Sequence, residues 1–245
     1  MRFTFLNLLL FTISFTSFGQ DSLYLKEINT TITILNKARK AAGLGNVSVS
    51  ATLSKGCVNH AKYLVINKDN ELTSGMSAHK EYPELKGYSK EGESAAKNAV
   101  IHYINPSEAI NGWLQTFYHR IPLLQPDLKE VGIGFYQKNG YVVTLIECIS
   151  GTRGEKVQSI VYYPNENQGS IPLLMGPEIP HPVGKQGNYG FPVTIYFANW
   201  QKLTNVSFKL TDSLGVEIRC HVSTPEKPAT YFSQWNSVCA IPEKP

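Results

Sequence analysis

Apolar residues at helical spacing predict two helices near the start of the chain. The first lies within residues 25–45, where apolar positions recur every three or four residues and Gly43 fits the end of a helix. The second lies within residues 50–68 and has Ser50 at its N-cap. Each helix is therefore expected to bury one face. The apolar positions that define the two faces are Ile28, Ile32, Leu35, Leu53, Cys57, Ala61 and Leu64.

The pattern changes from helix to strand before residue 150. Two apolar runs rich in Val, Ile and aromatic residues are separated by Asn139-Gly140, a dipeptide typical of tight hairpin turns. This predicts helices packed on an antiparallel hairpin. The expected elements are an irregular loop at 69–92, helices at 93–104 and 106–118, and strands at 131–137 and 141–149.

Beyond residue 150 the pattern indicates an all-β module. Short runs of Val, Ile, Tyr and Phe alternate with Pro and Gly, and Asp-Ser-Leu-Gly at 212–215 predicts a hairpin turn. We expect an immunoglobulin-like β-sandwich over residues 156–245, joined by a linker at 150–156. Such a sandwich needs a further strand after residue 245, so the sequence predicts a truncated chain or an open edge. The expected strands are 157–164, 191–199, 206–212 and 216–222.

Composition and the N-terminus narrow the class of protein. The chain of 245 residues is 42% hydrophobic and 17% charged, which is typical of a folded globular protein. Its net charge of +4 forms no basic stripe, so nucleic-acid binding is not expected. Arg2, the apolar run 3–15 and the small residues Ser17 and Gly19 predict a secretory signal peptide over residues 1–19. We expect a periplasmic or extracellular protein with no transmembrane segment after signal cleavage.

Export makes the four cysteines candidates for disulfide bonds. Four cysteines allow three pairings, and the simplest keeps each bridge within one half of the chain. This predicts the bridges Cys57–Cys148 and Cys220–Cys239. A metal site built from these cysteines is not favoured, because none of them are spaced C-x-x-C.

Four segments in the first half of the chain carry motifs in a characteristic order. Together, behind a predicted signal peptide, they resemble the CAP superfamily of cysteine-rich secretory, antigen 5 and pathogenesis-related proteins, in particular its secreted bacterial SCP-like members. The resemblance covers about residues 28–150. It implies an α+β protein in which a CAP domain at 26–150, an α-β-α sandwich around an antiparallel sheet, precedes the immunoglobulin-like module. The segments are LNKARKAAGL (35–44), LSKGCVNHAKYLV (53–65), SAHKEYPELKGYSKEGESAAKN (77–98) and AINGWLQTFYHRIPLLQPDLKEVGIGFY (109–136).

The resemblance implies a cleft with two histidines and two acidic residues. By motif the histidines are His79 and His119, which are expected to hold zinc or another divalent metal. Glu93, in Gly-Glu-Ser, resembles the Glu of the Gly-Glu-Asn motif of the family, and Glu81 is its rival because it follows His79 by two residues. The second acidic residue is expected on the helix after Trp113, where this chain has Leu, Gln and Thr. The acidic half of the site is therefore predicted to be incomplete.

Other candidate residues have simpler structural interpretations. His60 is expected to pack in the core with one hydrogen bond, and His119 has the alternative of bonding a backbone carbonyl at a helix end. Trp113 and Phe117 are expected in the core, and Arg120 is expected to pair with Glu130 or Glu147.

Two functions follow from these patterns. The first is a cleft that binds a divalent metal, a small ligand or a lipid, with no organic cofactor. If that cleft hydrolyses a substrate, His79 and His119 with Glu93 or Glu81 would hold the metal or activate a water. The second is a binding module in which the cleft is vestigial and the β module docks on envelope polysaccharide or a partner protein. The missing acidic residue favours binding over catalysis.

Overall fold

The computed structural model describes residues 16–245 apart from 153, 155–157, 167, 230–233 and 235. Most of the predicted signal peptide, residues 1–19, thus lies outside the described residues, as does part of the predicted linker. In the described part of the chain, no helix has both the length and the apolar character needed to cross a membrane.

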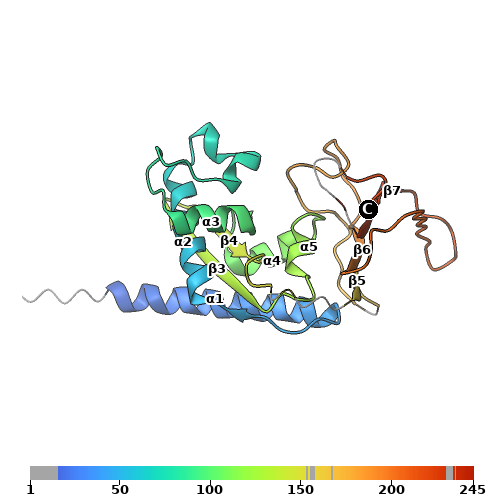
Figure 1. Ribbon diagram of the computed structural model, residues 1–245, viewed down its shortest axis with the longest axis horizontal. Coiled ribbons are helices and arrows are strands. Elements are labelled where there is room, and N and C mark those ends of the chain that lie inside the picture. Colours follow the sequence, from blue (N-terminus) through green and yellow to red (C-terminus); the bar gives the residue numbers. More distant parts are fainter. Residues whose placement is uncertain (1–15, 153, 155–157, 167, 230–233, 235) are drawn as a thin grey trace, which may run out of the picture.

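Helices dominate the first domain, which we define as residues 16–152 (Figure 1). The long helix α1 ends just before Gly43, which has a φ of +73°, the left-handed conformation that glycine adopts readily. The predicted helix stop is therefore confirmed. The helices are α1 Thr16–Ala41, α2 Ala51–Ile66, α3 Lys90–Asn98, α4 Pro106–Leu114 and α5 Arg120–Leu123, with the short 3-10 helices η1 Glu71–Thr73 and η2 Gly75–His79.

Four strands of the first domain form a sheet in the order β1-β3-β4-β2. The central hairpin is the predicted one: Gly132 pairs with Glu147, and Asn139 and Gly140 both have the positive φ that a tight hairpin turn requires. β1 runs parallel to β3, and β2 antiparallel to β4. The strands are β1 Ser48–Val49, β2 Ala99–His102, β3 Glu130–Lys138 and β4 Tyr141–Glu147.

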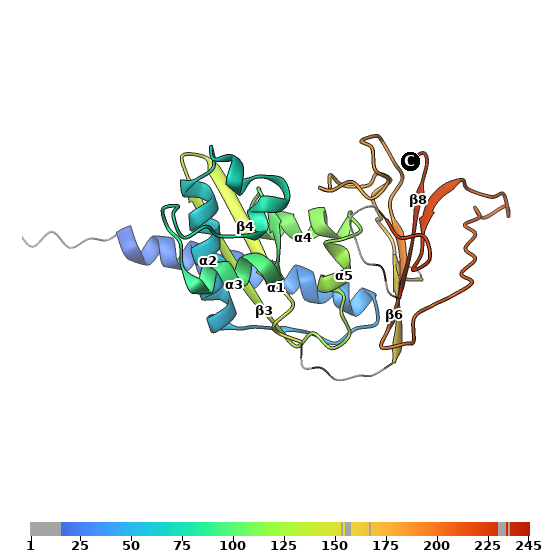
Figure 2. The ribbon, with the colours of Figure 1, turned by 45° about the horizontal axis from the view of Figure 1, so that its top comes forward.

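Helices cover both faces of this sheet (Figures 1 and 2). On one face, Ile133 and Ile146 pack with Leu35 of α1 and Trp113 of α4. On the other face, α2 residues pack with Val143 and Leu145 of β4. The strands alternate between the two cores as the period of two requires. The α-β-α layering expected from the resemblance is confirmed.

The β module, which we define as residues 158–245, is a separate antiparallel sheet with the order β5-β6-β8-β7. The α+β class and the all-β second part are therefore confirmed. Among the described residues, the module has these four strands in one sheet, with long irregular segments beside it. The strands are β5 Ser159–Tyr163, β6 Val193–Ala198, β7 Cys220–Ser223 and β8 Ser237–Pro242.

Two predicted elements are wrong. The helix expected at 93–104 ends at Asn98, and strand β2 follows because Ala99–His102 pairs with β4. The strand expected at 206–212 forms only an isolated bridge between Thr211 and Glu217. A run of β-branched residues becomes a strand only where a neighbouring strand is in register.

All four cysteines are free, so neither predicted disulfide is present. Cys220 pairs in register with Pro242 and Cys239 with Ser223, so the two lie three residues, about 10 Å, apart along their strands. A disulfide needs Cα atoms within about 7 Å. Cys57 and Cys148 belong to the two different cores. Burial raises the pKa of Cys57 to about 12, so this thiol stays protonated.

A buried arginine joins the two parts of the molecule. Arg120 at the start of α5 donates to the carbonyl oxygens of Leu114 (2.8 Å from Nε) and Pro192 (2.6 Å). Its guanidinium lies 4.7 Å from the ring centres of both Tyr163 and Phe191. The predicted pairing of Arg120 with Glu130 or Glu147 is therefore wrong: the β module supplies carbonyl and aromatic partners instead.

Candidate functional site

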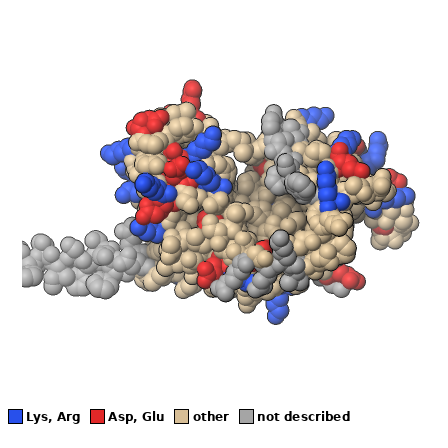
Figure 3. All heavy atoms as spheres, in the orientation of Figure 1, with Lys and Arg blue, Asp and Glu red and all other residues tan. Residues whose placement is uncertain are grey.

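A hollow between the first domain and the β module contains both predicted histidines. Two adjoining cavities, of about 330 and 200 Å³, share His79, His119 and Ile179 in their linings. In Figure 3 the charged side chains gather on the two outer lobes, and the surface between them is mostly uncharged. The larger cavity is also lined by Met76, Lys97, Val100, Pro122, Ile149 and Pro180, and the smaller by His102, Trp113, Thr116, Pro177 and Glu178.

His79 is held at the end of helix η2 by a backbone contact from α3. Its Nδ1 lies 3.1 Å from the carbonyl oxygen of Ala96. A carbonyl oxygen can only accept, so Nδ1 carries the proton and the lone pair is on Nε2. Burial lowers the pKa of His79, and the neighbouring His119 and His60 lower it further, against the hydrogen bond to Ala96. The ring is therefore neutral at pH 7.

His119 occupies the turn between α4 and α5 and contacts a carboxylate of the β module. Its Nδ1 lies 3.0 Å from Oε1 of Glu178, and the hydroxyl of Thr116 is 3.3 Å from the same nitrogen. The His119 side chain is 18% exposed and that of Glu178 is fully buried. As in His79, the partner at Nδ1 leaves Nε2 as the nitrogen available to a ligand.

Glu178 is the acidic residue that the sequence reasoning missed. It follows Pro177 in the Gly-Pro-Glu-Ile-Pro segment of the β module, far from every motif of the first domain. Its carboxylate accepts from the backbone N–H groups of Phe117 (2.9 Å), Tyr118 (2.7 Å) and His119 (3.2 Å). The second acidic residue of the family was expected on the helix after Trp113, where this chain has none; the carboxylate beside His119 instead lies 61 residues beyond Phe117.

His102 lies in the same hollow but is held in the opposite way. Its Nδ1 accepts from the backbone N–H of Tyr103 (2.9 Å), which places the proton of the neutral ring on Nε2. Burial lowers the pKa of this ring, and the nearby His119 acts in the same direction. His102 therefore presents no free lone pair to the hollow.

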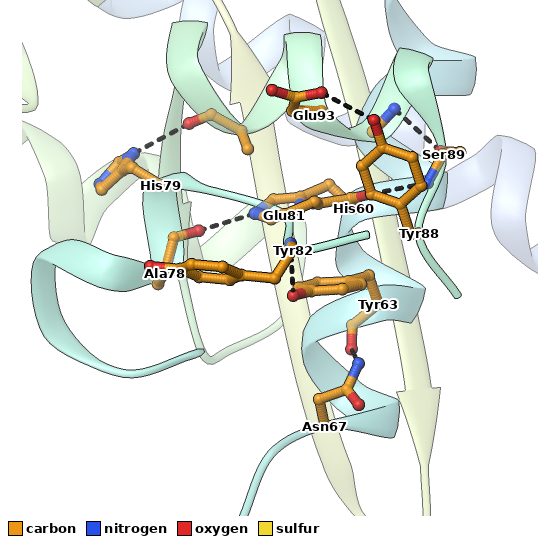
Figure 4. A network of polar contacts seen from close by, with 12 residues as sticks. His60, Tyr63, Asn67, Ala78, His79, Glu81, Tyr82, Tyr88, Ser89 and Glu93 are labelled. Atoms are coloured by element: carbon orange, nitrogen blue, oxygen red, sulfur yellow. Dashed lines mark hydrogen bonds and ion pairs between the residues drawn. The ribbon is translucent and has the colours of Figure 1, made fainter. Parts of the chain in front are cut away.

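The structure places Glu81 away from the hollow. Its Oε1 lies 3.0 Å from Nδ1 of His60, and its Oε2 accepts from the backbone N–H of Ser89 (2.8 Å). The other ring nitrogen of His60 is 2.7 Å from the carbonyl oxygen of Ala78. The His60 and Glu81 side chains are fully buried, so His60 is a core residue as predicted, with two contacts in place of one. Figure 4 draws no contact between this pair and His79.

Glu93 lies on α3 and is bound by neighbours on the surface. It accepts from Lys97 (2.6 Å) and from the hydroxyl of Tyr88 (2.9 Å). The hydrogen bond from Lys97, followed by that from Tyr88, lowers the pKa of Glu93. Figure 4 shows the Tyr88 contact and none to His79. Of the four predicted site residues, the structure brings together only His79 and His119.

The first domain matches a known protein family. Residues 32–148 match the cysteine-rich secretory protein family, CAP. This part of the chain is a CAP domain. The match runs from within α1 to the end of β4, so Glu178 lies outside the CAP domain.

The chain is also similar to two bacterial proteins. The uncharacterized membrane protein YlbC of Bacillus subtilis (strain 168) is 28% identical over 122 residues, 46% of this chain and 34% of that protein. The chain thus matches about a third of that relative. An extracellular protein containing a SCP domain from Bacillus anthracis str. Ames has a crystal structure with a TM-score of 0.36 and 17% identity, covering 49% of this chain and 40% of that one.

The hollow has two histidines as candidate ligands for a divalent metal. The described residues hold no group of three or more His, Cys, Asp or Glu arranged as metal ligands. His79 and His119 nevertheless both line one hollow, each with Nδ1 bonded to an acceptor. This is the arrangement of histidines that ligate metals through Nε2. Imidazole nitrogens are donors that zinc takes, and two histidines are one protein ligand short of the three that hold a catalytic zinc ion.

Proposed function

We propose that the CAP domain binds a divalent metal ion, of which zinc is the best match, through Nε2 of His79 and Nε2 of His119. The observation that carries this proposal is the hydrogen bonding of the two rings: in both, Nδ1 is bonded to an acceptor, so both lone pairs are directed away from that partner. Burial keeps His79 neutral, and a neutral imidazole is the form that ligates metal.

The same geometry favours binding over hydrolysis. A bound zinc ion supplies Lewis acidity and an acidic water. Neither Glu81 nor Glu93 reaches the hollow, and Glu178 is occupied by three backbone N–H groups and His119. A general base would need a carboxylate within about 3 Å of that water. We therefore assign metal binding to the hollow, and we assign proton transfer to none of its described residues.

The site is proposed to operate outside the cytoplasm. The apolar N-terminus with Arg2 and Gly19 supports export through the predicted signal peptide. Export would expose the hollow to metal ions, small ligands and envelope polysaccharide or protein, which are the partners expected for such a chain.

A second candidate function is the binding of a small ligand with an apolar part. The larger cavity places Val100, Pro122 and Ile149 beside the two histidines. Its rim includes Met76 and Ile179, which are 58% and 67% exposed. Such an apolar surface with a few polar groups is typical of ligand sites. A small molecule or lipid tail of this size would lie there, with its polar end at the histidines.

Isothermal titration calorimetry with zinc tests the metal proposal. The protein from residue 20 onward is titrated beside His79→Ala, His119→Ala and the control His221→Gln, which removes a histidine of strand β7. We expect one zinc ion per chain in the parent and the control, and loss of binding in both cleft variants. Absence of binding in the parent, or binding indifferent to both cleft changes, would contradict the metal site and leave the apolar cavity as the function of the hollow.

A further inference from the structure

We infer that the β module is part of the CAP site, and that Glu178 is the positioning residue of His119. The inference rests on the proposed role of His119 in the hollow. The β module thus positions a site residue of the CAP domain. From the sequence, the β module was expected to dock on envelope polysaccharide or a partner protein.

The first support is the number of contacts made by one carboxylate. Oε1 of Glu178 accepts from the backbone N–H of Tyr118 and of His119, and it also contacts Nδ1 of His119. Oε2 accepts from the N–H of Phe117. Hydrogen bonds to a buried carboxylate are about twice as strong as neutral ones. Glu178 therefore fixes both the backbone of the turn and the ring that projects from it.

The second support is the direction of the histidine. A carboxylate at Nδ1 selects the tautomer with the proton on Nδ1 and the lone pair on Nε2. His102 in the same hollow shows the alternative, because its Nδ1 accepts from a backbone N–H. Without Glu178, Nδ1 of His119 would keep only the longer 3.3 Å contact to the hydroxyl of Thr116, which holds the ring and its tautomer less firmly.

The third support is the way in which the segment carrying Glu178 is anchored. The N–H of Gly176 donates to the carbonyl oxygen of Gln115 (2.9 Å) in the CAP domain. The N–H of Met175 donates to Tyr189 (3.0 Å) within the β module. The segment is thus bonded to both parts, directly before Pro177 and Ile179 reach the wall of the hollow. A ligand site formed in this way exists only when the two parts are docked.

Nuclear magnetic resonance of the histidine ring nitrogens tests the inference without relying on zinc. Two-bond ¹H–¹⁵N spectra at pH 8 report which nitrogen of each neutral ring carries the proton. The full chain is compared with Glu178→Gln and with the control Glu217→Gln, an exposed carboxylate of the same module that pairs with Lys209. We expect the Nδ1–H tautomer at His119 in the parent and the control, and a mixture of tautomers in Glu178→Gln.

Zinc titration of the same proteins provides the second measurement. Loss of a partner that orients a ligand costs about 10–100-fold in metal affinity, so Glu178→Gln is expected to bind zinc at least about tenfold more weakly than Glu217→Gln. If the parent binds no zinc but its His119 tautomer depends on Glu178, the proposed metal function fails and the positioning role stands. A folded Glu178→Gln with an unchanged tautomer overturns the inference. If that variant does not fold, an Nε2–H tautomer at His119 in the parent overturns it, and an Nδ1–H tautomer supports it.

Discussion

At the scale of single residues, three glutamates of this chain show how burial decides the role of a carboxylate. Glu81 and Glu178 are each fully buried beside a histidine, whereas Glu93 keeps a third of its side chain exposed and bonds Lys97. A buried carboxylate must have its acceptor sites occupied, because an unpaired charge in the core is strongly unfavourable. Glu81 therefore contributes to the stability of the loop before α3, and Glu178 to the turn at His119.

Replacement of the two predicted site carboxylates, Glu81 and Glu93, should change the stability of the protein by different amounts. Glu81→Ala leaves His60 buried without its partner and frees the N–H of Ser89, so we expect it to lower the free energy of unfolding by about 3–5 kcal/mol. Glu93→Ala removes a solvent-exposed ion pair and is expected to change stability little. Urea unfolding followed by circular dichroism measures both. Equal losses in the two variants would contradict the structural role of Glu81.

At the scale of elements, helix α2 packs very closely against strand β3 of the central hairpin. Gly132 and Gly134 of β3 face Leu53 and Cys57 of α2, with no side chain between sheet and helix. A Cβ added at Gly134 would lie 2.6 Å from Cβ of Cys57 and would also collide with the backbone of Val58. The glycines are thus required by the approach of two backbones. This contact holds α2, and with it His60, against the sheet.

Gly134→Ala is therefore expected to force α2 away from β3. Overpacking of this kind costs about 1–3 kcal/mol, and the backbone contact places this site at the upper end. Gly45→Ala is the matched control: its Cβ would meet no atom within 4 Å, and its φ is not positive. Thermal unfolding should show a lowered midpoint only for Gly134→Ala. If Gly134→Ala had the same unfolding midpoint as Gly45→Ala, α2 could move away from β3 without loss of stability.

At the scale of the whole molecule, the CAP domain and the β module share one buried interface. Arg120 lies at its centre, and Phe117 and Ile121 pack beside it against Tyr189 and Ile241 of the β module. Burial lowers the pKa of Arg120 to about 10, which leaves the guanidinium charged at neutral pH. An arginine held by carbonyl oxygens and aromatic rings of both parts has these partners only while the two parts are docked.

Loss of Arg120 should separate the unfolding of the two parts. Arg120→Met keeps most of the side-chain volume but leaves the carbonyls of Leu114 and Pro192 without a donor, at a cost of about 2–4 kcal/mol. We expect two transitions in guanidinium unfolding in place of one cooperative transition. Arg219→Met, at an exposed position, controls for the change of charge. A single transition with unchanged midpoint in Arg120→Met would contradict the role of Arg120 in coupling the parts.

The sequence by itself determined much of the local structure and led to the prediction of the two histidines. Helical periodicity located α1 and α2, Asn139-Gly140 located the central hairpin, and the order of motifs indicated His79 and His119. These signals are local, because a helix or a turn requires particular residues at nearby positions. The family of the first domain follows from the same motifs.

Only the tertiary structure decided which charged groups meet. Glu178 contacts a turn about sixty residues earlier, Arg120 contacts a strand of the other sheet, and Glu81 binds His60 and not His79. Cys220 and Cys239 are separated by the strand register. No periodicity reports such contacts, since a buried charge is paired by whichever group the packing of distant elements brings within about 3 Å.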